Sequence, residues 1–225
     1  MQHPHTWRVL LILGIYLAMR YVLPMFVPGS QLLLKPITML VTFLHELGHA
    51  VAAILTGGGV QSLQVNADGS GVTWTYGGSR AITLMGGYIG SAIFGNVLFY
   101  IGATKPRWTR GTLIALGVVM IVSAFVWWSA VESFLILLLF GSALLLIARY
   151  TRWHRDLLMF FGLAAVLYIL QDFRVGPSSD LSAYGEQFPL IPVSVWMYTW
   201  LAIALVLFVL NLRLIWRRES QHKFN

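Results

Sequence analysis

Long apolar runs alternate with short polar or glycine-rich stretches along the chain. The hydrocarbon core of a bilayer is about 30 Å thick, and a helix needs roughly 20 apolar residues to cross it. The pattern therefore predicts an all-α polytopic membrane protein with about seven transmembrane helices. The predicted spans cover residues 7–26, 36–56, 81–103, 112–128, 134–147, 157–171 and 193–212.

The stretch between the second and third spans follows a different pattern. In residues 60–78, short alternations of apolar and polar residues flank the turn sequence Ala67-Asp68-Gly69-Ser70-Gly71. A period of two on both sides of an Asp-Gly turn is typical of a β-hairpin. We therefore expect a short hairpin directly after the helix of residues 36–56.

The third span, residues 81–103, is dense in small residues, among them the pair Gly86-Gly87. Small residues let two membrane helices approach closely, so this span is expected to pack tightly against the helix of residues 36–56. Asn96 lies on the same span, and its amide is expected to form a hydrogen bond between helices. Near the end of the chain, Ser178 or Ser179 is expected to cap a short helix that carries Asp180 in its first turn.

Composition agrees with a membrane location. The 225 residues are 58% hydrophobic and 10% charged, with a mean hydropathy of +0.75, which exceeds what a single soluble core can hide. Seven spans leave little of the chain over, so residues 1–225 are expected to form a single integral membrane domain. The chain has no cysteine, and any metal must therefore be held by histidine and carboxylate side chains.

The basic residues behind the formal net charge of +7 lie at the ends of apolar runs, which is typical of topology signals rather than of nucleic-acid binding. Alternating the seven spans places 11 of the 15 basic residues on one side and 3 on the other, with Arg20 inside a span. The more basic side is expected to be cytoplasmic. This predicts a multi-pass protein of the plasma (inner) membrane, with its amino terminus and residues 172–192 outside and its carboxyl terminus in the cytoplasm.

One short motif carries the candidate chemistry. His45-Glu46-Leu47-Gly48-His49 follows the pattern H-E-x-x-H within the second span. On a helix the two histidines lie one turn apart on the same face, where two imidazole nitrogens can bind one Zn²⁺ while Glu46 reaches a water at the metal. The motif therefore predicts a zinc hydrolase with Glu46 as its catalytic residue and His45 and His49 as metal ligands.

A catalytic zinc site needs a third protein ligand and an open position for water. Three carboxylates are poorly placed for this role, at the opposite side of the membrane, in the hairpin turn and at a distant turn: Asp156, Asp68 and Glu132. We favour Asp172, at the end of the span of residues 157–171, because an ionised group in the membrane is costly without a partner such as a metal. The alternative third ligand is Asp180, and Asp172 would then pair with Arg174.

Several stretches together resemble the site-2 protease family of intramembrane zinc metallopeptidases, most closely its B-like branch of small members. The resemblance covers about residues 37–100 and 165–187. It rests on the H-E-x-x-H motif, on residues 66–74 (Asn-Ala-Asp-Gly-Ser-Gly-Val-Thr-Trp), on residues 86–91 (Gly-Gly-Tyr-Ile-Gly-Ser) and on the late Asp172 with Ser179-Asp180.

The resemblance implies a zinc site of His45, His49 and a carboxylate, with Glu46 as the general base. The Asn-x-x-Pro and Leu-Asp-Gly elements that supply the third ligand in other members have no match in this chain. The resemblance therefore leaves the choice between Asp172 and Asp180 open.

These features together predict an intramembrane zinc metalloprotease whose partners are the lipid bilayer and a membrane protein substrate. The strand edge of the predicted hairpin could bind an extended peptide by strand addition, although a plain surface turn is the simpler interpretation. Two other classes of function remain open: a catalytically silent scaffold or regulator with the same fold, and a small proton-coupled transporter that relays protons through His and Glu. Zinc content separates them, since neither alternative needs stoichiometric zinc.

Overall fold

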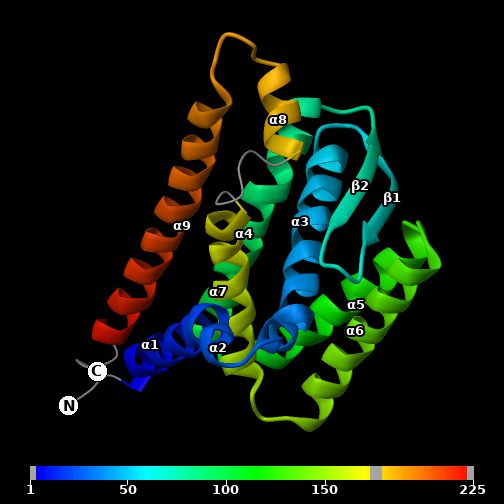
Figure 1. Ribbon diagram of the computed structural model, residues 1–225. Coiled ribbons are helices and arrows are strands. Elements are labelled where there is room, and N and C mark those ends of the chain that lie inside the picture. Colours follow the sequence, from blue (N-terminus) through cyan, green and yellow to red (C-terminus); the bar gives the residue numbers. More distant parts are fainter. Residues whose placement is uncertain (1–3, 173–178, 222–225) are drawn as a thin grey trace.

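The computed structural model describes residues 4–172 and 179–221. Its helices form a bundle, and two strands fold back along α3 (Figure 1). The helices are α1 (Pro4–Leu17), α2 (Leu23–Phe26), α3 (Lys35–Leu55), α4 (Arg80–Thr104), α5 (Thr109–Val126), α6 (Val131–Tyr150), α7 (His154–Asp172), α8 (Ser179–Glu186) and α9 (Val193–Gln221). A π-helical turn (Ala18–Val22) joins α1 to α2, a 3₁₀ helix (Ser30–Leu34) precedes α3, and the strands are β1 (Gly59–Val65) and β2 (Gly71–Tyr76).

Six helical segments of the described residues are long and apolar enough to cross a membrane. They are Trp7–Phe26, Leu32–Leu55, Arg80–Thr104, Thr109–Val126, Val131–Tyr150 and Val193–Arg217. The predicted span at residues 157–171 forms α7, which is not among these six. Its apolar side chains are covered mainly by protein, since α7 packs most extensively against α4, and Leu158, Met159 and Leu163 are almost fully buried. The fold is all-α and polytopic with a hairpin insertion, as predicted.

Glycines bring α3 and α4 into close contact. A Cβ atom at Gly48 would overlap the carbonyl oxygen of Gly86, and a Cβ at Gly86 would lie 2.6 Å from the Cβ of Ala52. At these positions only glycine leaves room for the neighbouring backbone. The predicted tight packing of the glycine-rich span against the motif helix is confirmed.

A pair of amides joins α4 to α9. The Nδ2 of Asn211 donates to the Oδ1 of Asn96 at 2.9 Å and to its backbone oxygen at 2.8 Å. The predicted interhelical hydrogen bond of Asn96 is confirmed, and Asn211 is its partner. This pair places the second half of α9 beside the second half of α4.

The hairpin lies along α3 with its buried face inward. Leu63 and Val65 on β1 are buried, and the hydroxyl of Thr42 on α3 donates to the carbonyl of Gly69 in the turn at 2.7 Å. The two strands pair antiparallel, with Leu63 opposite Thr73. The hairpin prediction is confirmed, and the turn is fixed to the same helix that carries the two histidines.

The α5–α6 connection covers the outer edge of β1. The N–H of Leu63 donates to the carbonyl of Trp127 at 3.0 Å, and its carbonyl accepts from the hydroxyl of Ser129 at 3.0 Å. The N–H of Val65 donates to the hydroxyl oxygen of Ser133 at 3.0 Å. Glu132, which the sequence places at a solvated turn, is exposed and accepts from the N–H of Ala67. One edge of the two-stranded sheet is therefore occupied, and the free edge belongs to β2.

The start of α1 and the end of α9 lie at the same end of the bundle (Figure 1). Arg155, at the start of α7, donates to the last carbonyls of α4, those of Gly102 and Ala103. Arg8 lies close enough to Arg155 for the two charges to repel. The first apolar run thus begins at the end of the bundle to which α9 returns.

Candidate metal centre

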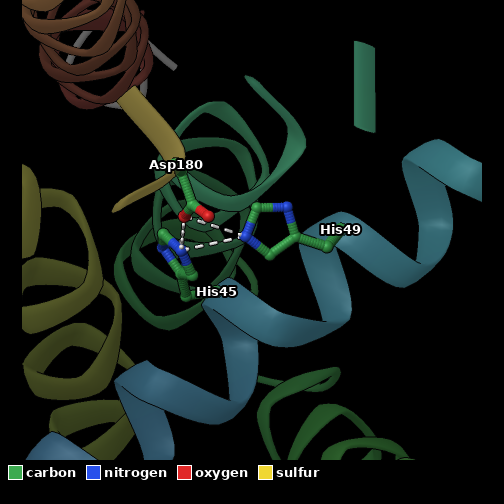
Figure 2. Close-up of side chains that lie close together, drawn as sticks. All are labelled: His45, His49 and Asp180. Atoms are coloured by element: carbon green, nitrogen blue, oxygen red, sulfur yellow. Dashed lines mark hydrogen bonds and ion pairs between the residues drawn. The ribbon is translucent and has the colours of Figure 1, made fainter. Parts of the chain in front are cut away.

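Helix α3 aims two imidazole rings at one point. His45 and His49 are one turn apart and buried, with 6% and 7% of their surface exposed. Their Nε2 atoms lie 3.1 Å from each other. Figure 2 shows both rings turned toward the same carboxylate.

That carboxylate belongs to Asp180, in the first turn of α8. Its Oδ2 lies 3.0 Å from the Nε2 of His45 and 3.1 Å from the Nε2 of His49. The three atoms form a nearly equilateral triangle, and they constitute the His and carboxylate group of the described residues that could hold a metal ion. Zn–N and Zn–O bonds of about 2.0 to 2.2 Å imply ligand atoms roughly 3.3 to 3.5 Å apart in a tetrahedral site. The triangle is close to this size.

The hydrogen bonds of the rings show which atoms carry lone pairs. The Nδ1 of His49 lies 2.7 Å from the carbonyl of Thr83, which only accepts, so Nδ1 carries the hydrogen. A neutral His49 therefore directs an Nε2 lone pair at the carboxylate of Asp180. A carboxylate this close to two imidazole nitrogens is balanced either by a proton on a ring or by a metal ion, and a backbone carbonyl on the second nitrogen is a usual support for a metal-bound histidine.

Gly87 on α4 leaves space at the centre of this group. A Cβ atom at Gly87 would lie 2.5 Å from the Nε2 of His45 and 2.5 Å from the Nε2 of His49. These are close to metal–ligand distances, so a glycine here keeps open the position from which one ion could contact both rings. The residues present fit a zinc ion.

An aromatic cluster holds α8 in place. Leu181 is fully buried, the ring of Tyr184 packs on Trp200 of α9 with centroids 5.0 Å apart, and Trp200 lies 5.7 Å from Tyr88 of α4. Burial acts to raise the pKa of the Asp180 carboxyl, but its hydrogen bonds with the two histidines outweigh burial and hold the pKa below its ordinary value. The carboxylate is therefore ionised, as a metal ligand must be.

Glu46 lies next to the triangle without belonging to it. The residue is buried, and its Oε2 accepts a hydrogen bond of 2.7 Å from the hydroxyl of Thr73 on β2. Its Oε1 lies over Gly71, where a Cβ atom would come within 2.6 Å of that oxygen. Two residues of the hairpin thus determine where the carboxylate of Glu46 can lie.

A cavity of about 1010 Å³ connects these groups. Its walls include the motif residues and Asp180, strand β2, the start of α4 at Arg80, and the rings of Tyr88 and Tyr168. The free edge of β2 and the metal-ligating group thus face one space, which is large enough for a segment of extended peptide.

The structure brings together His45, His49 and Asp180, with Glu46 beside them. The side chain of Asp172, the favoured third ligand from sequence, lies outside the described residues, as does Arg174, so that prediction stays a prediction. The structure confirms the predicted short helix with Asp180 in its first turn, and this helix is α8.

Three contributors were not anticipated: Thr73, Thr83 and Gly87. The carbonyl of Thr83 carries no side-chain signal at all. Side chains alternate between the two faces of a strand, and this alternation puts Thr73 on the face of the predicted hairpin that lies toward α3.

Comparison with family models gives one finding that covers most of the chain. Residues 10–211 match the model described as Peptidase M50B-like. Comparisons with curated proteins and with solved structures gave no match. The matched range includes α3, the hairpin, α4, α8 and most of α9, which are the elements that build the metal-ligating group. This chain is a member of the Peptidase M50B-like family, which confirms its predicted place among the site-2 proteases.

Proposed function

We propose that this integral, multi-pass membrane protein is an intramembrane zinc metalloprotease that hydrolyses peptide bonds of membrane-embedded protein substrates. The observation that carries the proposal is the convergence of His45, His49 and Asp180 on one point inside a large cavity, with the carboxylate of Glu46 beside them. Family membership supports peptidase chemistry at this site. A scaffold or a transporter would not require three ligand atoms about 3 Å apart.

The three ligands would be the Nε2 atoms of His45 and His49 and the carboxylate of Asp180. Bound there, Zn²⁺ supplies Lewis-acid chemistry: it acidifies water and polarises the scissile carbonyl. Glu46 takes the proton of the attacking water and returns it to the leaving amine, as a general base and then a general acid. Thr83 keeps His49 in the tautomer whose Nε2 can act as a ligand.

The free edge of β2 is suited to hold the substrate. The N–H groups of Leu63 and Val65 point away from β2, so their partners Thr73 and Gly71 form non-hydrogen-bonded pairs with them. In such pairs the backbone N–H and C=O groups of both residues face the outer edges of the sheet. Those of Thr73 and Gly71 are therefore available to an extended chain, and we propose strand addition as the mode of substrate binding.

Substrates are expected to be membrane helices that unwind locally. Every backbone group of an intact helix is satisfied internally, so its peptide bonds are closed to attack. A pairing edge on β2 would compensate an unwound segment for the backbone hydrogen bonds it loses. The polar cavity would admit the water that hydrolysis consumes.

Metal content gives the first test. Purified protein is expected to carry about one zinc per chain, and Asp180→Ala is expected to lose most of it, because two imidazoles alone hold zinc poorly. Asp172→Ala is the matched control, and we expect it to keep the metal. Mass spectrometry of the native protein measures both. Loss of zinc in Asp172→Ala with retention in Asp180→Ala would exchange the two assignments.

Cleavage gives the direct test of function. Wild-type protein in liposomes is expected to cut a panel of single-span membrane proteins, and a chelator is expected to stop the reaction until zinc is restored. A protein that binds zinc but cuts nothing in the panel would favour the scaffold interpretation. Proton flux without zinc would favour the transporter.

Topology follows from charge and from the position of α1. The basic ends of α4, α6 and α9 are expected to face the cytoplasm, and Arg8 lies at the same end. The chain lacks cysteine, so single-cysteine variants report location directly. An impermeant maleimide should label Glu186→Cys in intact cells and Arg8→Cys only after lysis. Labelling of Arg8→Cys in intact cells would support an outer amino terminus instead.

A further inference from the structure

We infer that Thr73 is a positioning residue that orients Glu46 as the proton acceptor of the reaction. The inference rests on the proposed function. Thr73 lies on β2, 27 positions after Glu46, and its hydroxyl is the side-chain donor to that carboxylate among the described residues. Its Oγ1 is 2.7 Å from Oε2 of Glu46 and 3.1 Å from the backbone oxygen of the same residue.

A hydroxyl has one hydrogen to donate and two lone pairs with which to accept. When Glu46 is ionised, the hydrogen of Thr73 points at Oε2, since bonds to a charged acceptor are the stronger ones. Oε2 of Glu46 is therefore occupied by this hydrogen bond. Oε1 remains to take a proton from water, and it lies over Gly71, on the wall of the cavity.

The hydrogen bond between Thr73 and Glu46 is also compatible with a protonated Glu46 carboxyl group. With the proton on Oε1, Oε2 is the carbonyl oxygen of the acid and still accepts from Thr73. The proton on Oε1 then stays on the cavity side, where the leaving amine can take it, and no heavy atom has to move. Thr73 thus holds Glu46 in one orientation through both halves of the reaction, which keeps the cost of reorganisation low.

The backbone around Thr73 is fixed well enough for this role. Its partner Leu63 is hydrogen-bonded on both backbone groups to the α5–α6 connection, and the hairpin turn is tied to Thr42 of α3. The hydroxyl is therefore held in place from two sides of the bundle, and it does not depend on a substrate to bring it to Glu46.

Three variants test the inference. Thr73→Val keeps the shape and removes the hydroxyl; it is expected to keep its zinc and its KM while kcat falls about 10- to 100-fold, the scale of loss when a catalytic group is misplaced. Thr73→Ser restores the hydroxyl and is expected to recover to within about threefold. Thr112→Val is the matched control, since Thr112 lies half-buried on α5 and its hydroxyl donates to the backbone oxygen of Trp108, just before that helix.

A second measurement does not depend on cleavage. In metal-free protein, the infrared carboxyl band that disappears in Glu46→Gln is expected to shift in Thr73→Val and to return to its place in Thr73→Ser. If wild-type protein cuts no substrate, the proposed function fails and this band alone decides the role of Thr73.

The inference would be overturned by wild-type kcat in Thr73→Val, by a Thr73→Ser protein as slow as Thr73→Val, or by a band that does not respond to either change. Loss of zinc in Thr73→Val would also overturn it, because Thr73 would then support the metal site rather than the base.

Discussion

Glu46→Gln is expected to bind zinc as the native protein does and to cleave substrate roughly 10²- to 10⁴-fold more slowly. The loss is that of general-base catalysis, because an amide cannot accept the proton of the attacking water. Zinc should remain because Glu46 lies outside the triangle of ligand atoms. The glutamine keeps the shape of the side chain and can still accept a hydrogen bond from Thr73.

The measurement pairs zinc by mass spectrometry with cleavage in liposomes, wild type beside variant. Glu186→Gln is the matched control, because Glu186 is exposed on α8 and faces no part of the reaction. Equal cleavage by wild type and Glu46→Gln would remove Glu46 from the mechanism. Loss of zinc in Glu46→Gln would instead make the residue part of the metal site.

Gly87→Ala is expected to abolish zinc binding while leaving both histidines and Asp180 in the chain. The added methyl group would lie 2.5 Å from both Nε2 atoms, in the space that the ion needs. The atoms that the methyl group meets belong to the two imidazole rings, so a movement that relieves the overlap turns the rings away from the ion. Cleavage should be lost together with the metal.

Gly111→Ala is the control for a glycine exchange in a helix, since a Cβ at Gly111 meets nothing within 4 Å. Helix content by circular dichroism should be the same in both variants. Stoichiometric zinc in a folded Gly87→Ala protein would show that the ion lies elsewhere than at the two imidazoles.

Local patterns predicted the helices and the motif because each is encoded within a few turns of chain. Apolar runs gave the spans, an Asp-Gly turn gave the hairpin, and the spacing of His45 and His49 placed both rings on one face. The lone amide of Asn96 in an apolar helix was enough to predict a partner. Its identity, Asn211, depends on how α4 packs against α9.

The rest of the site depends on contacts between segments far apart in sequence. Asp172 and Asp180 lie eight positions apart, at the end of α7 and the start of α8, and the sequence alone does not decide which of them faces α3. Which carboxylate faces the histidines follows from the docking of α8 on Tyr88 and Trp200, and aromatic packing of this kind has no signature in a single sequence. Gly87 and Thr73 likewise acquire meaning only once α4 and β2 lie against the motif helix.

Two observations bear on the direction of the first apolar run, and its orientation stays a prediction. Its length and hydropathy are those of a transmembrane helix, and strict alternation then puts the amino terminus outside. In the fold, its start lies beside the first turn of α7, at the end to which α9 returns. Hydropathy reports that a helix prefers lipid, whereas its direction depends on its neighbours.

The position of Asp180 has a consequence for biosynthesis. It follows His49 by 131 residues, and α8 is held in place by α9, the last helix of the described residues. In a nascent chain whose α9 has not yet packed against α8, only the two histidines of α3 are in position, and Asp180 is not. In the proposed protease, zinc binding would therefore wait for α9, and an intermediate without a docked α9 would not cleave its neighbours.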